Sequence, residues 1–293
     1  MDKATEKLLA RYRVEHGKGF RLKDHKPGDT GGIELEKDGA AEMLAKGVQY
    51  LADMQDKLYA QDRWSVLCLF QAMDAAGKDS AIKHVFSGVN PQGCHVASFK
   101  APNSTELDHD FLWRHQQWLP QRGQIGIHNR SWYEEVLVVR VHPTILAKQK
   151  LPPSLVTKRI FDERLEDIAA YERYLARQGV VVLKFFLHVS PEEQRKRFLA
   201  RIEEPEKNWK FSAADVQERE HWDEYQKAYQ EAIRATAAPH APWYVVPADR
   251  KWFTRLVVAA AIARAMEGLN LSYPELSDAD RRGLVEAKEK LLA

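Results

Sequence analysis

The sequence predicts an α/β protein in which one parallel sheet is covered by helices on both faces. Short apolar runs alternate with longer segments whose apolar residues recur at helical spacing, a pattern typical of strand–helix–strand crossovers. The expected strands are residues 64–70, 95–99, 123–128, 180–189 and 243–246. The chain has 293 residues, of which 44% are hydrophobic, and this is enough to bury a sizeable core.

The same periodicity predicts the helices and the division of the chain. Helices are expected over residues 37–61, 80–89, 105–119, 132–139, 158–178, 191–203, 213–237 and 251–267. Residues 1–40 are charged and contain a Gly-rich stretch at 26–32, so they are expected to form an extended N-terminal arm. Residues 41–270 form the main domain, with a lid at 195–215, and residues 271–293 form a C-terminal helical tail.

Composition excludes several classes of protein. The 44 Lys and Arg residues nearly balance the 42 Asp and Glu residues, whereas a general nucleic-acid binder usually has a larger basic excess. Two cysteines are too few for a disulfide framework. The N-terminus lacks an apolar signal region and no stretch approaches the ~20 apolar residues that span a bilayer, so we expect a cytoplasmic protein without a membrane partner.

A phosphate-binding loop is predicted directly after the first long strand. The segment from Gln71 to Ser80 joins a strand to a helix through small residues, and the start of a helix attracts anions. Gly77 allows close approach of a phosphate and Lys78 supplies positive charge. The strict Walker A pattern fails twice, since Ala72 replaces its first Gly and Asp79 replaces its hydroxyl residue. A plain tight connection with a solvated Lys78 is the alternative.

Asp74 favours the phosphate site over that alternative. A carboxylate inside a phosphate cradle is unfavourable unless a cation bridges the two, so Asp74 is expected to bind Mg²⁺, with Mn²⁺ as an alternative metal.

A second group of polar residues follows the strand at 123–128. Ligands gather at the carboxyl ends of parallel strands, so Arg130 should face the phosphate loop and could stabilise charge on a transferring phosphoryl group. Glu134 and Glu135 could hold metal or orient a nucleotide. The alternative is an ordinary surface ion pair between Arg130 and Glu134, which are four residues apart.

A third group forms the predicted lid. The helix from Pro191 carries several cations, breaks at Pro205 and leads into a Lys-Asn-Trp-Lys turn, after which Ser212 can cap the next helix. A cationic lid that closes over phosphates would exclude water from the reaction. The alternative is a solvated helical hairpin with Trp209 and Phe211 packed inward.

Together these groups resemble the polyphosphate kinase 2 family, over roughly residues 58–255. The resemblance rests on the order and spacing of short motifs, which are Asp74-Ala75-Ala76-Gly77-Lys78, Asn90-Pro91-Gln92-Gly93, Phe111-Leu112-Trp113-Arg114, Asn129-Arg130-Ser131-Trp132-Tyr133, Arg201 with Pro205, Lys207, Trp209-Lys210-Phe211-Ser212, and Ala241-Pro242-Trp243-Tyr244. It implies a thymidylate-kinase-like P-loop kinase fold with a helical lid. It also implies Mg²⁺-dependent transfer of the terminal phosphoryl group of inorganic polyphosphate to a nucleotide, in a reversible reaction.

The resemblance assigns roles to individual residues. Asp74, Lys78 and Arg130 are the implied catalytic residues. Asn129 and Glu134 are expected to contact the nucleotide, and Asp74 and Glu135 are expected to bind the metal. Glu135 is included because Asn129 stands where other members carry Asp, so the second carboxylate must come from another position. The expected phosphate-binding and polyphosphate-binding residues are Ala75, Ala76, Gly77, Asp79, Ser80, Lys158, Arg197, Arg201, Lys207 and Lys210.

The motifs are most similar to the third class of the family, which phosphorylates AMP and ADP to give ADP and ATP. The implied partners are polyphosphate and adenine nucleotides, with guanine nucleotides as a second candidate, in a homodimer or homotetramer. A basic run at Lys148, Lys150, Lys158, Arg159 and Arg164 independently fits a linear polyanion. Two other functions remain open, namely a nucleoside monophosphate kinase that uses ATP as donor and a non-catalytic module that binds nucleotides or polyanions.

Overall fold

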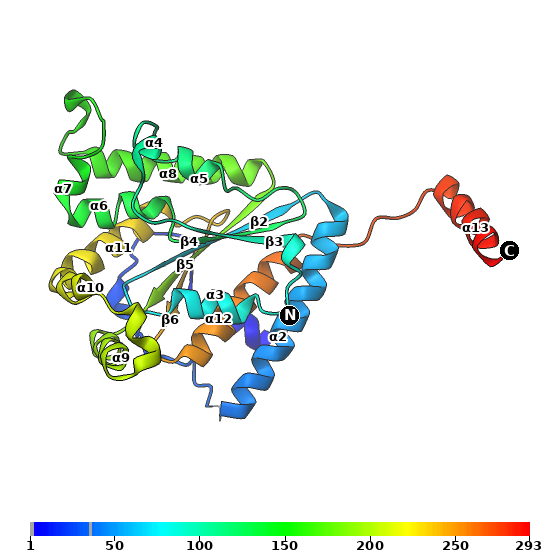
Figure 1. Ribbon diagram of the computed structural model, residues 1–293, viewed down its shortest axis with the longest axis horizontal. Helices are drawn as coiled ribbons and strands as arrows, with labels where there is room; N and C mark the ends of the chain where they lie inside the picture. The colour runs from blue at the N-terminus through cyan, green and yellow to red at the C-terminus, as the bar shows by residue number, and fades with distance from the viewer. Residues whose placement is uncertain (1–2, 35–36) are drawn as a thin grey trace.

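A six-stranded sheet forms the centre of the protein (Figure 1). The computed structural model describes residues 3–34 and 37–293. The strands lie in the order β1-β6-β5-β2-β4-β3. Their bounds are β1 (Arg13–Val14), β2 (Ser65–Ala72), β3 (Cys94–Ser98), β4 (Ile125–Asn129), β5 (Val180–His188) and β6 (Trp243–Pro247). All five long strands match predicted runs to within about two residues at either end.

Strand β2 occupies the middle of the sheet and determines where a ligand can bind. It pairs in parallel with β4 and with β5, so that Phe70 lies opposite both Asn129 and Phe185. The carboxyl ends of these strands therefore open on the same edge of the sheet, where the connections after β2 and β4 can meet. The predicted parallel sheet is confirmed for these strands.

Helices cover both faces of the sheet (Figure 1), as predicted. One face carries α2 (Lys37–Gln61), α3 (Lys78–Val85) and α12 (Lys251–Glu267), and α12 packs against both of the others. The other face carries α8 (Ile160–Arg177) and α11 (Trp222–Thr236). The remaining helices are α1 (Lys3–Ala10), α4 (Ser104–Leu107), α5 (Trp113–Gln116), α6 (Val138–Val141), α7 (Pro143–Leu146), α9 (Pro191–Glu203), α10 (Ala213–Gln217) and α13 (Asp278–Leu292).

The N-terminal segment is part of the main fold, so the prediction of an extended arm is wrong for residues 3–24. Strand β1 adds to the sheet edge by pairing antiparallel with β6, and Leu9, Tyr12 and Phe20 are buried in the common core. The Gly-rich loop at 26–32 is irregular, as expected, but Asp29 accepts a hydrogen bond from the Tyr12 hydroxyl at 2.9 Å. The segment packs here because β6 would otherwise be an edge strand with unpaired backbone N–H and C=O groups, which β1 pairs with.

Three predicted helices are interrupted. The expected helix at 105–119 breaks because the Asp110 carboxylate accepts from the backbone N–H groups of Leu112 and Trp113, which replaces helical hydrogen bonds. The expected helix at 213–237 divides into α10, a 3₁₀ turn η6 (Glu218–His221) and α11. Likewise 132–139 becomes a 3₁₀ turn η3 (Trp132–Glu135) followed by α6.

The C-terminal tail stands away from the body of the protein (Figure 1). Helix α13 begins at a capping box between Ser277 and Asp280, and its residues are all exposed. Across residues 3–34 and 37–293, no helix is both long and apolar enough to cross a membrane.

Candidate active site

The loop between β2 and α3 has the backbone shape of a phosphate cradle. Ala75 and Gly77 both adopt positive φ, at 59° and 105°, and Gly77 immediately precedes α3. Only glycine adopts such a φ without strain, which explains why a glycine occupies position 77. At Ala75 the same backbone conformation must be stabilised by contacts with its surroundings. The loop therefore bends sharply and brings its backbone to the start of α3, where an anion is favoured.

Arg197 on α9 holds this loop in place. Its guanidinium donates to the carbonyl oxygens of Ala75 and Ala76 at 3.1 and 2.7 Å, and to those of Ala248 and Asp249 at 2.6 and 3.2 Å. Its Nε donates to Glu193 at 2.8 Å. All three guanidinium nitrogens are thus occupied by the protein. This geometry does not support the predicted direct contact of Arg197 with polyphosphate, and it makes Arg197 a brace for the loop.

Lys78 lies inside the mouth of the loop. Its Nζ donates to the carbonyl oxygen of Ala72 at 3.2 Å, at the end of β2. Burial and the neighbouring Arg130 lower the pKa of Lys78, while Asp74 and Glu134 act in the opposite direction. This contradicts the alternative in which Lys78 is a solvated side chain on a simple strand-to-helix turn. Its ammonium lies beside the position that a phosphate on the loop would take.

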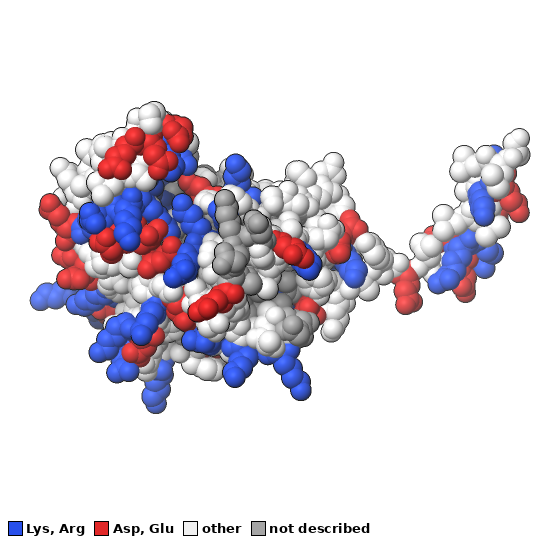
Figure 2. Space-filling view, turned by 90° about the horizontal axis from the view of Figure 1, so that it is seen from below, with Lys and Arg blue, Asp and Glu red and all other residues white. Residues whose placement is uncertain are grey.

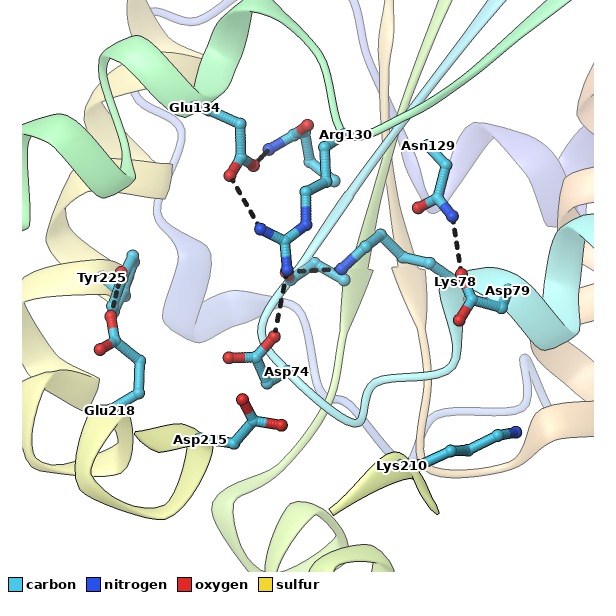
Figure 3. A network of polar contacts seen from close by, with 12 residues as sticks. Asp74, Lys78, Asp79, Asn129, Arg130, Glu134, Lys210, Asp215, Glu218 and Tyr225 are labelled. Atoms are coloured by element: carbon cyan, nitrogen blue, oxygen red, sulfur yellow. Dashed lines mark hydrogen bonds and ion pairs between the residues drawn. The ribbon is translucent and has the colours of Figure 1, made fainter. Parts of the chain in front are cut away.

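Arg130 faces Lys78 from the end of β4 (Figure 3). Its backbone is in the left-handed region at φ 68°, and its N–H donates to the carbonyl oxygen of Phe70 at 3.0 Å. The guanidinium lies between the carboxylates of Asp74 at 3.6 Å and Glu134 at 3.5 Å. The predicted ion pair with Glu134 is present, but the second contact, with Asp74, joins Arg130 to the loop.

A buried relay fixes the position of Glu134. Gln71, which is fully buried on β2, donates from Nε2 to Glu134 at 2.7 Å. Gln71 accepts in turn from the hydroxyl of Ser131, which is also buried, at 3.2 Å. Gln71 was not among the predicted site residues, although a polar residue at the end of an apolar strand is a usable signal because buried polar groups require partners.

Glu135 points elsewhere, and this corrects its predicted pairing with Asp74 at a metal. Its carboxylate accepts from Arg164 at 3.1 Å and from Gln149 at 2.7 Å. Burial raises the pKa of Glu135, which those two partners oppose. Adjacent side chains in a 3₁₀ turn diverge by about 120°, so Glu134 faces Arg130 while Glu135 faces α8.

The predicted basic run is also divided by ion pairs. Arg164 is committed to Glu135, Lys150 to Asp108, and Arg159 lies 3.6 Å from Glu166. Lys158 is exposed and has no ion partner within 4 Å in the described part of the chain. The run therefore does not form a continuous cationic track.

Two departures from the expected motifs explain each other. The Asn129 amide donates to the Asp79 carboxylate at 2.6 Å (Figure 3). An Asp at position 129 would instead place two carboxylates together, which is unfavourable unless a cation or proton intervenes. Ser80, one residue further, accepts from the Arg255 guanidinium at 2.9 Å.

A cavity of about 400 Å³ opens beside Asp74, Arg130 and Glu134. Its walls combine apolar side chains from residues 137–145 with polar and aromatic groups from the lid and α11. The wall residues are Leu137, Val138, His142, Ile145, Asp215, Glu218, Arg219, Tyr225 and Tyr229. None of them was among the predicted site residues, although Tyr225 and Tyr229 share one face of a helix by their spacing.

The polar wall of this cavity is connected. Glu218 accepts from the Tyr225 hydroxyl and lies 2.6 Å from Nε2 of His142. Burial would raise the pKa of Glu218, but these two hydrogen bonds lower it below its usual value. Burial and the nearby Asp74 raise the pKa of Asp215, while Arg201 opposes the shift.

The lid consists of α9, a 3₁₀ turn η5 (Pro205–Lys210) and α10. Figure 2 shows Lys and Arg side chains interleaved with acidic ones over this part of the surface. Arg201 pairs with Asp215 at 3.2 Å and Lys207 with Glu204. Lys210 lies over the ring of Trp209, which is 79% exposed. This exposure contradicts the alternative of an inward-packed hairpin.

The residues present fit a divalent cation at Asp74. No group of three or more His, Cys, Asp or Glu side chains converges within residues 3–34 and 37–293. Mg²⁺ in kinases is commonly held by one or two carboxylates and by substrate phosphates, with water completing the shell. The donor chemistry of Asp74, with Glu134 and Asp215 on the same cavity, matches that arrangement.

Comparisons with known proteins identify the family of this chain. A family model described as polyphosphate kinase 2 matches residues 34–273. The chain is 53% identical over 257 residues to an ADP-polyphosphate phosphotransferase of Rhodopseudomonas palustris, covering 87% of this chain and 89% of that protein. It is 43% identical over 278 residues to an AMP/ADP-polyphosphate phosphotransferase of Meiothermus ruber, covering 95% of this chain and all of the relative.

The fold agrees as well. A crystal structure of polyphosphate kinase 2 from Arthrobacter aurescens TC1 superposes with a TM-score of 0.84 at 36% identity, covering 94% of this chain and 95% of that one. The predicted P-loop kinase fold, a sheet flanked by helices, is thereby confirmed. The match extends over most of the chain and includes the loop, Arg130 and the lid, and we conclude that the chain belongs to the polyphosphate kinase 2 family.

Proposed function

We propose that this enzyme transfers the terminal phosphoryl group of inorganic polyphosphate to AMP and to ADP, giving ADP and ATP, and that the reaction is reversible. One observation carries the proposal. Arg130 stands between the phosphate loop and the cavity, in contact with Asp74 on one side and Glu134 on the other. A group that passes from a donor on the loop to an acceptor in the cavity would pass this guanidinium.

The donor polyphosphate binds on the loop side. Lys78, the backbone of Ala76 and Gly77, and the start of α3 together offer positive charge and backbone donors to its terminal phosphates. Lys207 and Lys210 on the lid contact the chain when the lid closes. Closure also keeps water away from the transferring group.

The acceptor nucleotide binds in the cavity. Its phosphates point toward Arg130, and the nucleoside lies among the apolar side chains from 137–145 and the rings of Tyr225 and Tyr229. Such pockets are mostly apolar, with a few polar groups that fix orientation. The predicted nucleotide contact of Glu134 is retained, since it lines the cavity, whereas Asn129 acts through Asp79.

In-line transfer breaks the bond between the terminal phosphorus and its bridging oxygen and forms a bond to an oxygen of the nucleotide phosphate. Arg130 and Lys78 stabilise the charge on the transferring group and on the departing polyphosphate. Asp74 would hold a divalent cation, which would neutralise further charge on the phosphates. Glu134, held by Gln71, keeps Arg130 in position.

Acceptor choice separates the relatives. The 53% identical relative is named for ADP alone, whereas the 43% identical relative is named for both AMP and ADP. We assign this chain to the third class because its motifs resemble that class and because the relative named for both AMP and ADP is matched over its full length. Asn129 does not carry this assignment, since its amide bonds Asp79 and does not line the nucleotide cavity. Use of guanine nucleotides and assembly as a homodimer or homotetramer remain predictions.

The test is a time course with AMP, long-chain polyphosphate and Mg²⁺, free of adenylate kinase, with Lys78→Ala as the control. ADP should rise first and ATP should follow. ADP that accumulates without ATP, or AMP that stays untouched while ADP reacts, would contradict the assignment to the third class. Transfer to AMP from ATP but not from polyphosphate would instead identify a nucleoside monophosphate kinase.

A further inference from the structure

The first turns of α12 are attached to the phosphate loop. Arg255 donates from Nη2 to the Ser80 hydroxyl at 2.9 Å, in the first turn of α3. Arg197 links the same region from the other side, since it bonds both the loop carbonyls and the carbonyl oxygens of Ala248 and Asp249 just before α12. The start of α12 is therefore a wall of the phosphate site.

This wall carries an excess of positive charge. Lys251 and Arg255 are four residues apart on α12, so they lie on one face about 5–6 Å from each other. Lys207 and Arg197 lie close enough to lower the pKa of Lys251, although burial is the larger cause. The nearby carboxylates are occupied, because Glu193 pairs with Arg197 and Glu204 with Lys207.

Lys251 and Arg255 lack such partners. Neither lies within 4 Å of a carboxylate in the part of the chain that the structure describes. The Nε of Arg255 is buried and has no hydrogen-bond partner at all. That buried Nε is out of reach of a ligand, but the positive charges of Lys251 and Arg255 are not neutralised by a carboxylate, and a phosphate at the loop could neutralise them.

The position of the wall excludes the nucleotide as that acceptor. The cavity for the nucleotide is lined from β2, β4, residues 134–145, the lid and α11, and no residue of α12 reaches it. In Figure 3, Glu134, Tyr225 and Glu218 lie on one side of Lys78, and Asp79 and Lys210 lie on the other. Ser80, which accepts from Arg255, directly follows Asp79 in the first turn of α3.

We infer that polyphosphate extends from Lys78 along the start of α12, where Arg255 and Lys251 bind its non-reacting phosphates and thereby favour long donors over short ones. This inference rests on the proposed function. A linear chain of phosphates presents one charge after another, so each cation that follows the loop adds affinity only for a donor long enough to reach it. A donor as short as tripolyphosphate therefore gains less from these cations than a long chain does.

The test compares donor lengths by direct binding and by kinetics. Binding of long-chain polyphosphate and of tripolyphosphate is measured by titration calorimetry without nucleotide, for the wild type, Lys251→Ala, Arg255→Ala and a matched control, Lys227→Ala. Lys227 is an exposed lysine on α11. The KM for each donor is then measured with saturating AMP and Mg²⁺.

We expect Lys251→Ala to weaken long-chain polyphosphate by about tenfold in both Kd and KM, with less than a twofold change for tripolyphosphate. Lys251→Arg should restore binding, and the loss should shrink at high salt because screening already removes part of the attraction. Arg255→Ala should weaken the long chain at least as much. The control should match the wild type with both donors.

An equal loss of affinity for long-chain polyphosphate and for tripolyphosphate would show that Lys251 has a merely structural role, and this would overturn the inference. An unchanged affinity for the long chain in Lys251→Ala would overturn it as well. The binding arm separates this from failure of the proposed function. If long-chain polyphosphate binds and depends on Lys251 but no ADP forms from AMP, the track stands and the proposed reaction is wrong.

Discussion

Replacing Lys184 by Met should destabilise the protein strongly, because it breaks a buried ion pair beneath the active site. Lys184 on β5 and Glu172 on α8 are 0% and 1% exposed, and the Lys184 Nζ donates to Glu172 at 2.5 Å and to the carbonyl oxygen of Thr236 at 2.7 Å. Glu172 also accepts from Tyr133 at 2.8 Å and from Trp132 at 3.3 Å, just after Arg130.

The size of the stability loss depends on the unpaired carboxylate of Glu172 that the substitution leaves in the core. Met matches the length of Lys, so little volume is lost, but the Glu172 carboxylate stays buried without its counter-charge. Removing one partner of a buried pair costs about 3–5 kcal/mol. With an unfolding entropy of about 2.1 cal/mol/K per residue over 293 residues, that loss lowers Tm by roughly 5–8 °C.

The loss should depend on pH in a defined direction. Burial raises the pKa of Glu172, and Lys184 opposes that shift in the wild type. Without Lys184 the pKa in the folded state rises further above that in the unfolded state. A group with a raised pKa contributes stability at low pH and loses it as pH rises through the folded value. The deficit of Lys184→Met is therefore largest near neutral pH and shrinks toward acid pH.

Urea unfolding followed by circular dichroism measures the effect, with an unchanged m-value as the check that both states are comparable. Lys227→Met is the exposed control and should stay within about 0.5 kcal/mol of the wild type. Adding Glu172→Gln to Lys184→Met should recover part of the loss, because it removes the remaining charge and keeps an oxygen for Tyr133. A loss below about 1 kcal/mol, or one independent of pH, would refute the reasoning.

Four further predictions concern the reaction. Lys78→Ala should lower kcat by about 10²–10³ without lowering Tm, and wild-type turnover in this variant would remove Lys78 from the site. Because the pKa of Lys78 is lowered, kcat/KM should decline on the alkaline side at a pH below the usual pKa range of a lysine. In Lys78→Arg this decline should move to higher pH, and a decline at an unchanged pH would show that another group titrates. Asp74→Asn should raise the Mg²⁺ concentration needed for half-maximal rate, and an unchanged metal titration would exclude Asp74 as a ligand. Alanine at both Lys207 and Lys210 should raise the KM for polyphosphate more than the KM for AMP, with a smaller difference at high salt, and equal losses would argue against the lid contact.

Local patterns in the sequence were sufficient for the fold class and for the strongest elements. The helices over 37–61, 191–203 and 251–267 were predicted with the bounds that the structure has, and over 37–61 the apolar residues repeat at helical spacing for several turns. The loop from Asp74 to Lys78 was also predicted, since a strand, a Gly and a helix start are adjacent in the chain. Family membership followed from such short motifs in a fixed order.

The tertiary structure alone decided which side chains meet. Glu134 and Glu135 are adjacent residues of the same type, so periodicity could not show that η3 directs Glu134 toward Arg130 and Glu135 toward Arg164. The bracing role of Arg197 depends on carbonyl groups more than 50 residues away in either direction, and the packing of the N-terminal segment depends on the free edge of β6. Local propensity contains no information on such distant partners, so directions of side chains and segments with weak periodicity are fixed only when the core assembles.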